Sequence, residues 1–573
     1  MTARRRAIDA PWLAVAVVVT VAAAIVVIAL LGRDDDRFAR ERKLDARRPA
    51  PVAVLARAGH RPDSAPAIPP DVAAAEGEWP HPNHDYANTR ATTTSEIDSS
   101  NVATLGVSWQ RRLHGASKWG AAASGPLIAG GVLYFQDLTS DVFAIDAATG
   151  VLRWKHAVEQ KAFGPNGPAL GWGKVFVGNG DRHYVALDAK SGKVLWRTPV
   201  AGPTGQHQPV PYGGYLLTGL AAGRKARGSA KLLKTQLLKP GASGYAYALA
   251  QDDGHVVWEF QTVERSFWGN PKVNSGAGIW MPPAVDPASG LTYWSTGNPG
   301  PAPGTGAYPN GSSRPGANLY SNTMLALELR TGKLRWHKQV ERHELFHHDF
   351  QNAPILADAG GRKLVVGSGK GGKVVAFDRT TGEVVWETPV GRHENDDLKE
   401  LPIGQVVTVY PGFWGGVETP GAYADGTLYY PVVDMPTPYT ATAWEAKDGQ
   451  TSVENLEGRT EYDKGTSQIV AIDAASGKIK WSRALPAPDF GAATVVNDLV
   501  FTATYDGKIY ALARDDGRIV WRFQAPGGIN AWPAVAGDVI VWPVGLGRKP
   551  VLMALKLGAR GKPAQPEARV DEE

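Results

Sequence analysis

The chain has 573 residues, of which 66 are Gly, 42 are Pro and none is Cys. The lack of Cys excludes disulfides, thiolate metal sites and a cysteine nucleophile, and the Gly and Pro content is typical of a turn-rich β protein. The formal net charge is +5, of which +4 belongs to residues 1–50, so the rest of the chain is close to neutral. This balance argues against a nucleic-acid partner.

An uncharged apolar segment occupies residues 10–32, which are 23 consecutive positions. As a helix it would be roughly 34 Å long, enough to span the hydrocarbon core of a bilayer. A cleaved signal peptide is the alternative, but its apolar region is shorter, about 7–15 residues, and no small-x-small cleavage site follows here. We therefore expect a short basic tail at 1–9 and one uncleaved transmembrane helix at 10–32, with the membrane as a partner.

Residues 33–77 are rich in Ala, Pro and Arg and predict a flexible or partly extended linker. Three Arg precede the apolar segment, and seven Lys or Arg follow it within residues 33–48. Counted literally by the positive-inside rule, these charges would place the following domain in the cytoplasm.

Beyond the linker the chain repeats one pattern. Each copy has a short apolar run, Ala, an apolar residue, often Asp, then a turn with Gly and, four residues later, Trp. Each copy predicts two strands joined by a turn in which Gly supplies a positive φ, and the Trp offers a large apolar contact between neighbouring sheets. The seven copies end at Trp154, Trp196, Trp258, Trp336, Trp386, Trp481 and Trp521.

The spacing of these Trp residues fits β-propeller blades. Trp154 and Trp196 are 42 residues apart, which suits one four-stranded blade, and the longer intervals carry inserted loops. Residues 551–557 look like a repeat that lacks its last strand, and residues 102–109 look like that missing strand. Pairing the two would close a ring and leave no long open sheet edge.

We therefore predict an all-β fold, an eight-bladed β-propeller over residues 78–557 followed by a disordered tail at 558–573. An open stack of blades, or two smaller propellers, is the alternative.

One inserted segment carries the literal H-E-x-x-H pattern of zinc peptidases at His343–His347. That chemistry needs both His on one helix face, whereas this segment lies between two predicted strands, so we favour loop histidines with satisfied hydrogen bonds. A looser alternative is a transition-metal site that also uses His348 and Asp349, because imidazole suits such metals.

A second inserted segment is strongly basic. Residues 197–251 contain no Asp or Glu, and six Lys or Arg lie between residues 224 and 239. This segment predicts either a solvated loop or a surface for an anionic partner or lipid headgroup.

Two further segments resemble a known family. Residues 78–90 read Glu-Trp-Pro-His-Pro-Asn-His-Asp-Tyr-Ala-Asn-Thr-Arg, and residues 527–533 read Gly-Gly-Ile-Asn-Ala-Trp-Pro. With the repeats, they resemble quinoprotein alcohol dehydrogenases, eight-bladed propellers that bind pyrroloquinoline quinone (PQQ) on their central axis. The resemblance covers about residues 78–557. The repeats alone are shared with non-catalytic propellers, including the outer-membrane-assembly lipoprotein.

The resemblance implies roles for three residues. Trp280 matches the Trp that stacks on the quinone, Asn298 a Ca²⁺ ligand, and Lys370 the cation at the quinone oxygens. An indole face suits a planar cofactor, an amide oxygen suits a hard cation, and an ammonium group would stabilise negative charge that develops on a quinone oxygen.

Three departures from the family pattern concern the same site. Aligned without gaps, the general-base Asp becomes His347, and Asp349 would lie on the same face of an extended segment, so both are candidate catalytic bases. The Ca²⁺-ligating Glu should precede Tyr245, in the stretch that has no acidic residue. Residues 164–168 occupy about the place of two adjacent Cys that cover the quinone.

These departures predict a degenerate quinone and Ca²⁺ site. The sequence therefore favours a membrane-anchored ligand-binding or scaffold propeller, with a small-molecule or protein ligand in its axial funnel. The alternative is a PQQ-dependent oxidoreductase with an altered active site, for which PQQ and Ca²⁺ would be the cofactors. The family resemblance points to an exported domain, so we expect the propeller on the extracytoplasmic side, against the count of positive charges.

Overall fold

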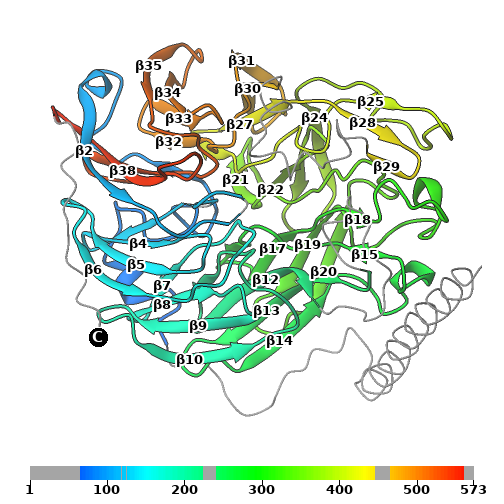
Figure 1. Ribbon diagram of the computed structural model, residues 1–573, viewed down its shortest axis with the longest axis horizontal. Coiled ribbons are helices and arrows are strands. Elements are labelled where there is room, and N and C mark those ends of the chain that lie inside the picture. The colour runs from blue at the N-terminus through cyan, green and yellow to red at the C-terminus, as the bar shows by residue number, and fades with distance from the viewer. Residues whose placement is uncertain (1–64, 118, 124, 224–239, 445–464, 561–573) are drawn as a thin grey trace, which may run out of the picture.

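The computed structural model describes residues 65–117, 119–123, 125–223, 240–444 and 465–560. In this part of the chain, antiparallel four-stranded sheets follow one another around a common axis (Figure 1). Eight such four-stranded units, called blades 1 to 8 here in chain order, are formed by the described residues, and short extra strands extend two of these sheets. This arrangement confirms the predicted eight-bladed propeller.

The strands of each blade run from the axis to the rim in chain order. Blades 1 to 4 consist of β3 (Leu127–Ala129), β4 (Val132–Gln136), β5 (Val142–Asp146) and β6 (Leu152–His156); β7 (Ala169–Gly171), β8 (Lys174–Gly178), β9 (His183–Asp188) and β10 (Val194–Pro199); β11 (Val210–Tyr212), β12 (Tyr215–Gly223), β13 (Ser243–Ala250) and β14 (Val256–Gln261); and β16 (Ala284–Asp286), β17 (Leu291–Ser295), β19 (Thr323–Glu328) and β20 (Leu334–Gln339).

Blades 5 to 7 repeat this order, and blade 8 takes its outermost strand from the N-terminal part of the chain. They consist of β21 (Ile355–Ala359), β22 (Arg362–Gly369), β23 (Lys373–Asp378) and β24 (Val384–Pro389); β26 (Ala422–Ala424), β27 (Thr427–Asp434), β30 (Thr466–Asp473) and β31 (Ile479–Leu485); β32 (Thr494–Val496), β33 (Leu499–Ala503), β34 (Lys508–Ala513) and β35 (Ile519–Gln524); and β36 (Ala534–Ala536), β37 (Val539–Val544), β38 (Val551–Leu557) and β2 (Leu105–Arg112).

Short elements decorate this ring. They are the helices α2 (Pro70–Ala73), η1 (Val102–Thr104), η2 (Phe267–Gly269) and η3 (Pro309–Gly311), and the strands β1 (Ala91–Thr92), β15 (Ser275–Gly276), β18 (Pro299–Gly300), β25 (Val407–Val409), β28 (Thr437–Thr440) and β29 (Ala443–Trp444).

Blade 8 closes the ring as the sequence predicted. β2 pairs antiparallel with β38, with Val107 opposite Leu555 and Trp109 opposite Ala554. In Figure 1 the blue β2 lies against the red β38, so the two ends of the propeller share one sheet. The alternatives of an open stack or two smaller rings are thereby excluded.

The repeated Gly and Trp residues hold neighbouring blades together. A Cβ added to each Gly would lie 2.5–2.7 Å from a ring atom of the Trp of the preceding blade. The indole N–H of that Trp donates to a carbonyl of the same turn at 2.8–3.2 Å. Each Gly is therefore required by the indole above it as well as by its positive φ. The seven pairs are Trp109 with Gly150, Trp154 with Gly192, Trp196 with Gly254, Trp258 with Gly332, Trp336 with Gly382, Trp386 with Gly477 and Trp481 with Gly517.

The segment that precedes β2 ties four blades together near the axis. Asn88 donates to the carbonyls of Pro282 and Pro354, and the buried Arg90 donates to those of Ala493 and Pro533. Each of these carbonyls lies just before the innermost strand of its blade. The Asn-Thr-Arg segment therefore stabilises the ring. This structural role of Asn88 and Arg90 could not be predicted from the sequence pattern.

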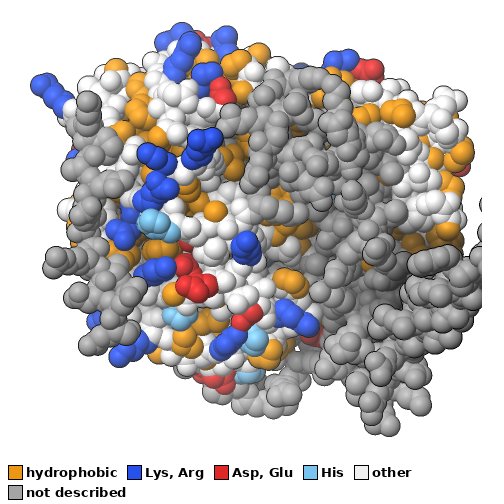
Figure 2. Space-filling view, viewed as in Figure 1, with side chains coloured by type: hydrophobic (Ala, Val, Ile, Leu, Met, Phe, Trp, Pro, Cys, Tyr) orange, Lys and Arg blue, Asp and Glu red, His pale blue; other side chains and the backbone are white. Residues whose placement is uncertain are grey.

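The packed part of the chain begins before residue 78. The Asp71 carboxylate in α2 accepts hydrogen bonds from the backbone N–H groups of Trp172 and Gly173, each at 2.9 Å, so residues 70–73 dock on blade 2. On the face shown in Figure 2, Lys and Arg side chains are spread among hydrophobic side chains together with fewer Asp and Glu.

Several predictions lie outside the described residues. These are the apolar segment at 10–32, the basic insertion at 224–239 and most of the C-terminal tail. Within the described ranges, no helix has both the length and the apolar character needed to cross a bilayer. The transmembrane helix at 10–32 stays a prediction.

Candidate active site

A cavity of about 120 Å³ is formed by loops that lead toward the innermost strands of several blades. We call it the axial cavity. Because these loops come from different blades, residues far apart in sequence meet there. Its main lining residues are Trp119, Phe163, Trp280, Asp349, Lys370, Trp414, Glu418 and Trp532.

Aromatic side chains make the walls of the axial cavity. The Phe163 ring centroid lies 4.3 Å from that of Trp119 and 5.7 Å from that of Trp280. Trp119 also packs against Trp414, with the centroids 5.9 Å apart. The indole N–H of Trp532 is buried and has no hydrogen-bond partner among the described residues. The walls therefore offer flat apolar faces and one free donor to a planar ligand.

Lys370 provides the charge of this cavity. Its ammonium nitrogen lies 2.8 Å from Asp349 Oδ2 and 3.8 Å from Glu418 Oε1. It also lies 5.2 Å and 5.0 Å from the ring centroids of Phe413 and Trp414. Lys370 is only 5 % exposed, so its charge is buried in the wall of the axial cavity.

The protonation states of the three charged groups differ. Burial acts to raise the pKa of Asp349, but Lys370 and His347 outweigh it and hold that pKa below its ordinary value. Burial raises the pKa of Glu418 to about 8, although Lys370 opposes the shift. Burial acts to lower the pKa of Lys370, yet Asp349 and Glu418 raise it. At neutral pH, Lys370 and Asp349 form a neutral ion pair and Glu418 keeps its proton.

Asn298 orients the Asp349 carboxylate. Its backbone N–H donates to Asp349 Oδ1 at 2.8 Å, while its side-chain amide donates to the Pro299 carbonyl. A Cβ added to Gly297 would lie 2.3 Å from the same Asp349 oxygen and 3.0 Å from Trp280 Nε1. The Gly-Asn-Pro segment therefore brings Asp349 close to Trp280 because position 297 carries no side chain.

His347 lies beside Asp349 as the sequence predicted, but the backbone between the two residues forms a turn and is not extended. His347 has a φ of 62°, and its carbonyl accepts the Asp349 N–H at 3.1 Å. The two side chains come within 3.6 Å, and the imidazole packs on Phe413 at 4.2 Å. Burial lowers the pKa of His347 to about 3, with Lys370 adding to the shift, so the ring is neutral and a weak base.

The H-E-x-x-H segment does not have the geometry of a zinc peptidase. Residues 343–347 are not helical. The ring nitrogens of His343 lie 3.3 Å from the Gly316 and Asn310 carbonyls, whereas His347 faces Asp349 and Phe413. The two imidazoles have different neighbours, and they share no ligand position.

The axial cavity fits a planar quinone better than a divalent ion. A quinone needs flat apolar faces, a cation and a hydrogen-bond donor, which Trp280, Lys370 and Trp532 supply. Ca²⁺ needs six to eight oxygen ligands. In the described chain only Asp349 and Glu418 bring carboxylates to the cavity. From β12, where the family pattern expects a Glu, the side chain that packs with Trp280 is Ala221. The donor set therefore does not fit Ca²⁺.

Phe163, Gly164 and Pro165 line the cavity where the family pattern expects two adjacent Cys. Phe163 packs obliquely against Trp280, at an interplanar angle of 43°. An aromatic ring can cover a planar ligand, so this segment offers an apolar face without a disulfide.

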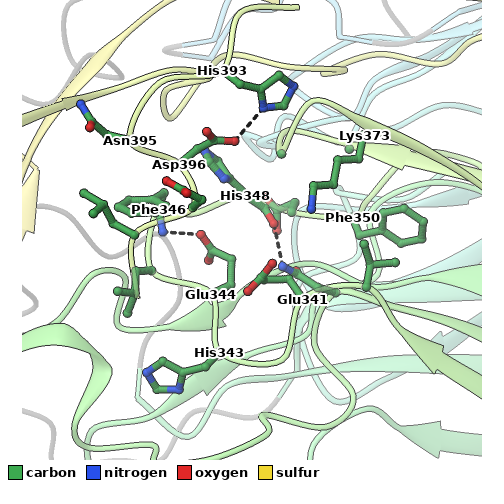
Figure 3. A pocket seen from close by; sticks show the side chains of 18 of the residues that line it. Glu341, His343, Glu344, Phe346, His348, Phe350, Lys373, His393, Asn395 and Asp396 are labelled. Carbon is green, nitrogen blue, oxygen red and sulfur yellow. Dashed lines mark hydrogen bonds and ion pairs between the residues drawn. The ribbon is translucent and has the colours of Figure 1, made fainter. Parts of the chain in front are cut away.

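A second, larger cavity of about 470 Å³ shares Asp349 with the axial cavity. Figure 3 shows this second cavity with Glu344, Phe346 and His348 among its lining side chains. We call it the side cavity. Glu344 is 3 % exposed, and its carboxylate accepts a hydrogen bond from the Phe346 backbone N–H. Its other oxygen has no partner among the described residues. Burial raises the pKa of Glu344 to about 8. The backbone N–H of His348 and the positive charge of Arg314 oppose this shift.

Glu344 makes the stability of the protein pH-dependent. Its pKa is about 8 in the folded protein and 4.5 as an ordinary Glu, so between these values the unfolded chain binds fewer protons, and the free energy of unfolding falls as pH rises. Between pH 5 and pH 7, we expect the free energy of unfolding of the wild type to fall by about 2 kcal/mol relative to that of Glu344→Gln. Denaturant unfolding measures this difference. Glu344→Asp, which still titrates, should keep the wild-type trend. Parallel profiles for wild type and Glu344→Gln would contradict this assignment.

The structure brings together all five residues that the sequence proposed for the site. Trp280, Asp349 and Lys370 line the axial cavity, and Asn298 and His347 contact Asp349. The sequence missed five others. Trp119, Phe163, Trp414 and Glu418 lie in irregular loops outside the repeat pattern, and Trp532 lies within the Gly-Gly-Ile-Asn-Ala-Trp-Pro segment that was used only to identify the family.

Comparisons with known proteins agree with this architecture. Residues 229–394 match the family described as "Glucose/ethanol/alcohol dehydrogenase, beta-propeller domain", and residues 94–263 and 425–551 match "Outer membrane protein assembly factor BamB". The quinohemoprotein alcohol dehydrogenase ADH IIB of Pseudomonas putida is 28% identical over 516 residues, which are 80% of this chain and 71% of that relative. The lanthanide-dependent methanol dehydrogenase of Methylorubrum extorquens is 26% identical over 78% of this chain and 82% of its own.

Solved structures show the same fold. The quinohemoprotein alcohol dehydrogenase ADHIIG of Pseudomonas putida HK5 superposes with a TM-score of 0.71, at 21% identity, over 87% of this chain and 83% of its own. A europium-containing methanol dehydrogenase gives a TM-score of 0.68 at 21% identity, over 84% of this chain and 98% of its own. This chain belongs to the PQQ-type, quinoprotein alcohol dehydrogenase-like β-propeller family.

Proposed function

We propose that this protein is a quinone-dependent oxidoreductase that oxidises an alcohol-type substrate in the axial cavity. The observation that carries the proposal is the buried Lys370–Asp349 ion pair, at 2.8 Å, inside walls of Trp and Phe. Relatives that align over about four fifths of this chain bear dehydrogenase names, which favours this function over the scaffold that the sequence departures suggested.

Each residue of the cavity has a chemical task in this proposal. A bound quinone would supply the two-electron acceptor. The indole of Trp280 would stack on a planar ligand, and the Trp532 N–H and the Lys370 ammonium group would donate to its oxygens. Lys370 would also stabilise negative charge that develops there during reduction. A divalent metal has no part in these tasks because the donor set does not fit one.

Asp349 is the proton acceptor in this proposal. It is ionised beside Lys370, and the Asn298 N–H holds one of its oxygens, so its Oδ2 is positioned to take the proton of a substrate hydroxyl. The neighbouring His347 is too weakly basic for this role, because burial lowers its pKa to about 3.

The axial cavity has to widen to admit a tricyclic quinone. Its volume of about 120 Å³ is below the roughly 300 Å³ at the lower end of small-molecule sites. Phe163 is half-buried, lies on a loop and packs against Trp280, so rotation of its side chain is the simplest way to open the space beside Trp280.

Quinone binding is the direct test. We expect the full-length chain to quench its Trp fluorescence on titration with PQQ and to retain PQQ through gel filtration. Trp280→Ala should weaken binding by about 10- to 100-fold, because it removes the stacking face. The matched control is Trp521→Phe, on the outermost strand of blade 7, which should bind as the wild type does.

The result also decides between the two functional classes. Retention of PQQ together with reduction of a dye by primary alcohols supports the oxidoreductase. No binding at high micromolar PQQ removes it and leaves a ligand-binding or scaffold propeller. The anchor at residues 10–32 and the extracytoplasmic position of the propeller belong to the proposal in either case.

A further inference from the structure

We infer that the Lys370 ammonium group is the resident cation of the axial site and that this site works without a divalent or trivalent metal ion. The inference rests on the proposed function, since it names the electrostatic partner that a quinone would meet. It concerns the chain's own residues, so it is also testable without any quinone.

Both oxygens of the Asp349 carboxylate already accept hydrogen bonds. Asp349 Oδ1 accepts the Asn298 N–H at 2.8 Å, and Oδ2 accepts the Lys370 ammonium group at 2.8 Å. A metal ion at Asp349 would have to share these oxygens with the two donors, one of which is itself a cation. Asn298 donates its backbone N–H to Asp349 and its side-chain N–H to the Pro299 carbonyl, so it could offer a metal ion no more than one neutral amide oxygen.

The charges of Lys370 and Asp349 already balance at the axial site. Glu418, the one further carboxyl that the described residues bring to the cavity, lies 3.8 Å from the same ammonium nitrogen. A metal ion would add two or three positive charges next to that ammonium group within a buried site, where like charges repel strongly. The faces of Phe413 and Trp414, 5.2 Å and 5.0 Å away, stabilise the ammonium group further.

Apart from Asp349 and Glu418, the side-chain oxygens that line the axial cavity are neutral, those of Gln351, Thr419 and Asn530. Ala221 and Met281 occupy the wall beside Trp280 with apolar side chains. In the described ranges, three or more metal-type side chains come together only at Asp252, Asp253 and His255 on the surface of blade 3. The site therefore accommodates one positive charge, and Lys370 supplies it.

The test uses Tb³⁺, whose emission is sensitised by a nearby indole, with Trp280 as the antenna. We expect the wild-type full-length chain to show no sensitised emission that depends on Asp349, and PQQ retention to be unchanged by EDTA. We expect Lys370→Ala to free Asp349 and Glu418 for a cation and to bind Tb³⁺ at least about tenfold more tightly than the wild type does. The double variant Lys370→Ala/Asp349→Asn should lose this gain.

The controls separate the axial site from other carboxylates. Lys373→Ala removes a more exposed neighbouring lysine, paired with Glu387 at 3.4 Å, and should behave as the wild type. Emission from Asp252, Asp253 and His255 would be equal in all variants. If Lys370→Ala does not fold, Tb³⁺ titrations of the wild type and of Asp349→Asn still show whether the wild-type site binds the ion at Asp349.

Asp349-dependent Tb³⁺ binding by the wild type, or loss of PQQ on EDTA treatment, would overturn the inference. So would a folded Lys370→Ala variant that gains no Tb³⁺ affinity. Because the Tb³⁺ titration contains no quinone, a failure of PQQ to bind leaves its outcome unaffected and counts against the proposed function alone.

Discussion

Asp349→Asn should lower the alcohol-dependent turnover of the PQQ-loaded protein by about 10²- to 10⁴-fold, the usual contribution of a general base. The amide keeps the shape of the carboxylate and can still accept the Asn298 N–H, which now bonds Asp349 at 2.8 Å. It cannot accept a substrate proton at neutral pH. Quinone affinity should stay equal or increase, because Lys370 loses its carboxylate partner. Steady-state dye reduction and fluorescence titration measure the two effects separately.

His347→Gln is the matched control for that variant. His347 lies 3.6 Å from Asp349 but contacts the cavity only through it, so the change should lower turnover by less than about tenfold and shift the pH profile of kcat rather than abolish it. Equal losses in the two variants would show that they act as one unit. A larger loss in His347→Gln would assign the base to His347 and refute the role of Asp349.

The ring of blades could be predicted from sequence because the information is local and repeated. Gly150 and Trp154 belong to one hairpin turn, and the same interval recurs in every copy. Each of the seven Gly residues then lies against the Trp of the preceding blade, so the repeat encodes both the strand pair and the sheet-to-sheet contact. Even the closure between Val107 and Leu555 was readable, because each partial repeat lacks what the other supplies.

The site was only partly predictable. Trp280, Asn298 and Lys370 lie in segments with a recognisable family pattern, so their positions could be carried over. Lys370 could not be called buried from its Gly-rich hairpin, since burial there comes from the loop of Phe413 and Trp414 in the next blade. Such contacts between loops of different blades leave no periodic signal in a sequence.

Glu418 shows the limit most clearly. It follows two Gly in a loop with no repeat signature, and its approach to Lys370, at 3.8 Å, depends on how blades 5 and 6 pack. The turn at His347, with its φ of 62°, likewise replaced the extended backbone that a reading of sequence alone assumes. Both features come from tertiary packing that overrides local preference.

Leu555→Asp should unfold the propeller or destabilise it by at least about 5 kcal/mol. Leu555 is fully buried in β38, opposite Val107 of β2 and Ile540 of β37. Truncating such a Leu costs about 2–5 kcal/mol, and an unpaired buried carboxylate adds to that cost. Because β38 is the only link between β37 and β2 in blade 8, the loss falls on the contact that closes the ring, and cooperative unfolding follows from the exposed sheet edges.

The adjacent residue provides the control. Lys556 projects to the other face of β38 and pairs with Asp538 at 3.3 Å, with 42% of its side chain exposed, so Lys556→Ala should change the free energy of unfolding by less than about 1 kcal/mol. Denaturant unfolding followed by Trp fluorescence distinguishes the two variants. A Leu555→Asp protein with wild-type stability would mean that the ring does not depend on β38, and the contacts of Trp109 with Gly150 would then have to hold β2 in place alone.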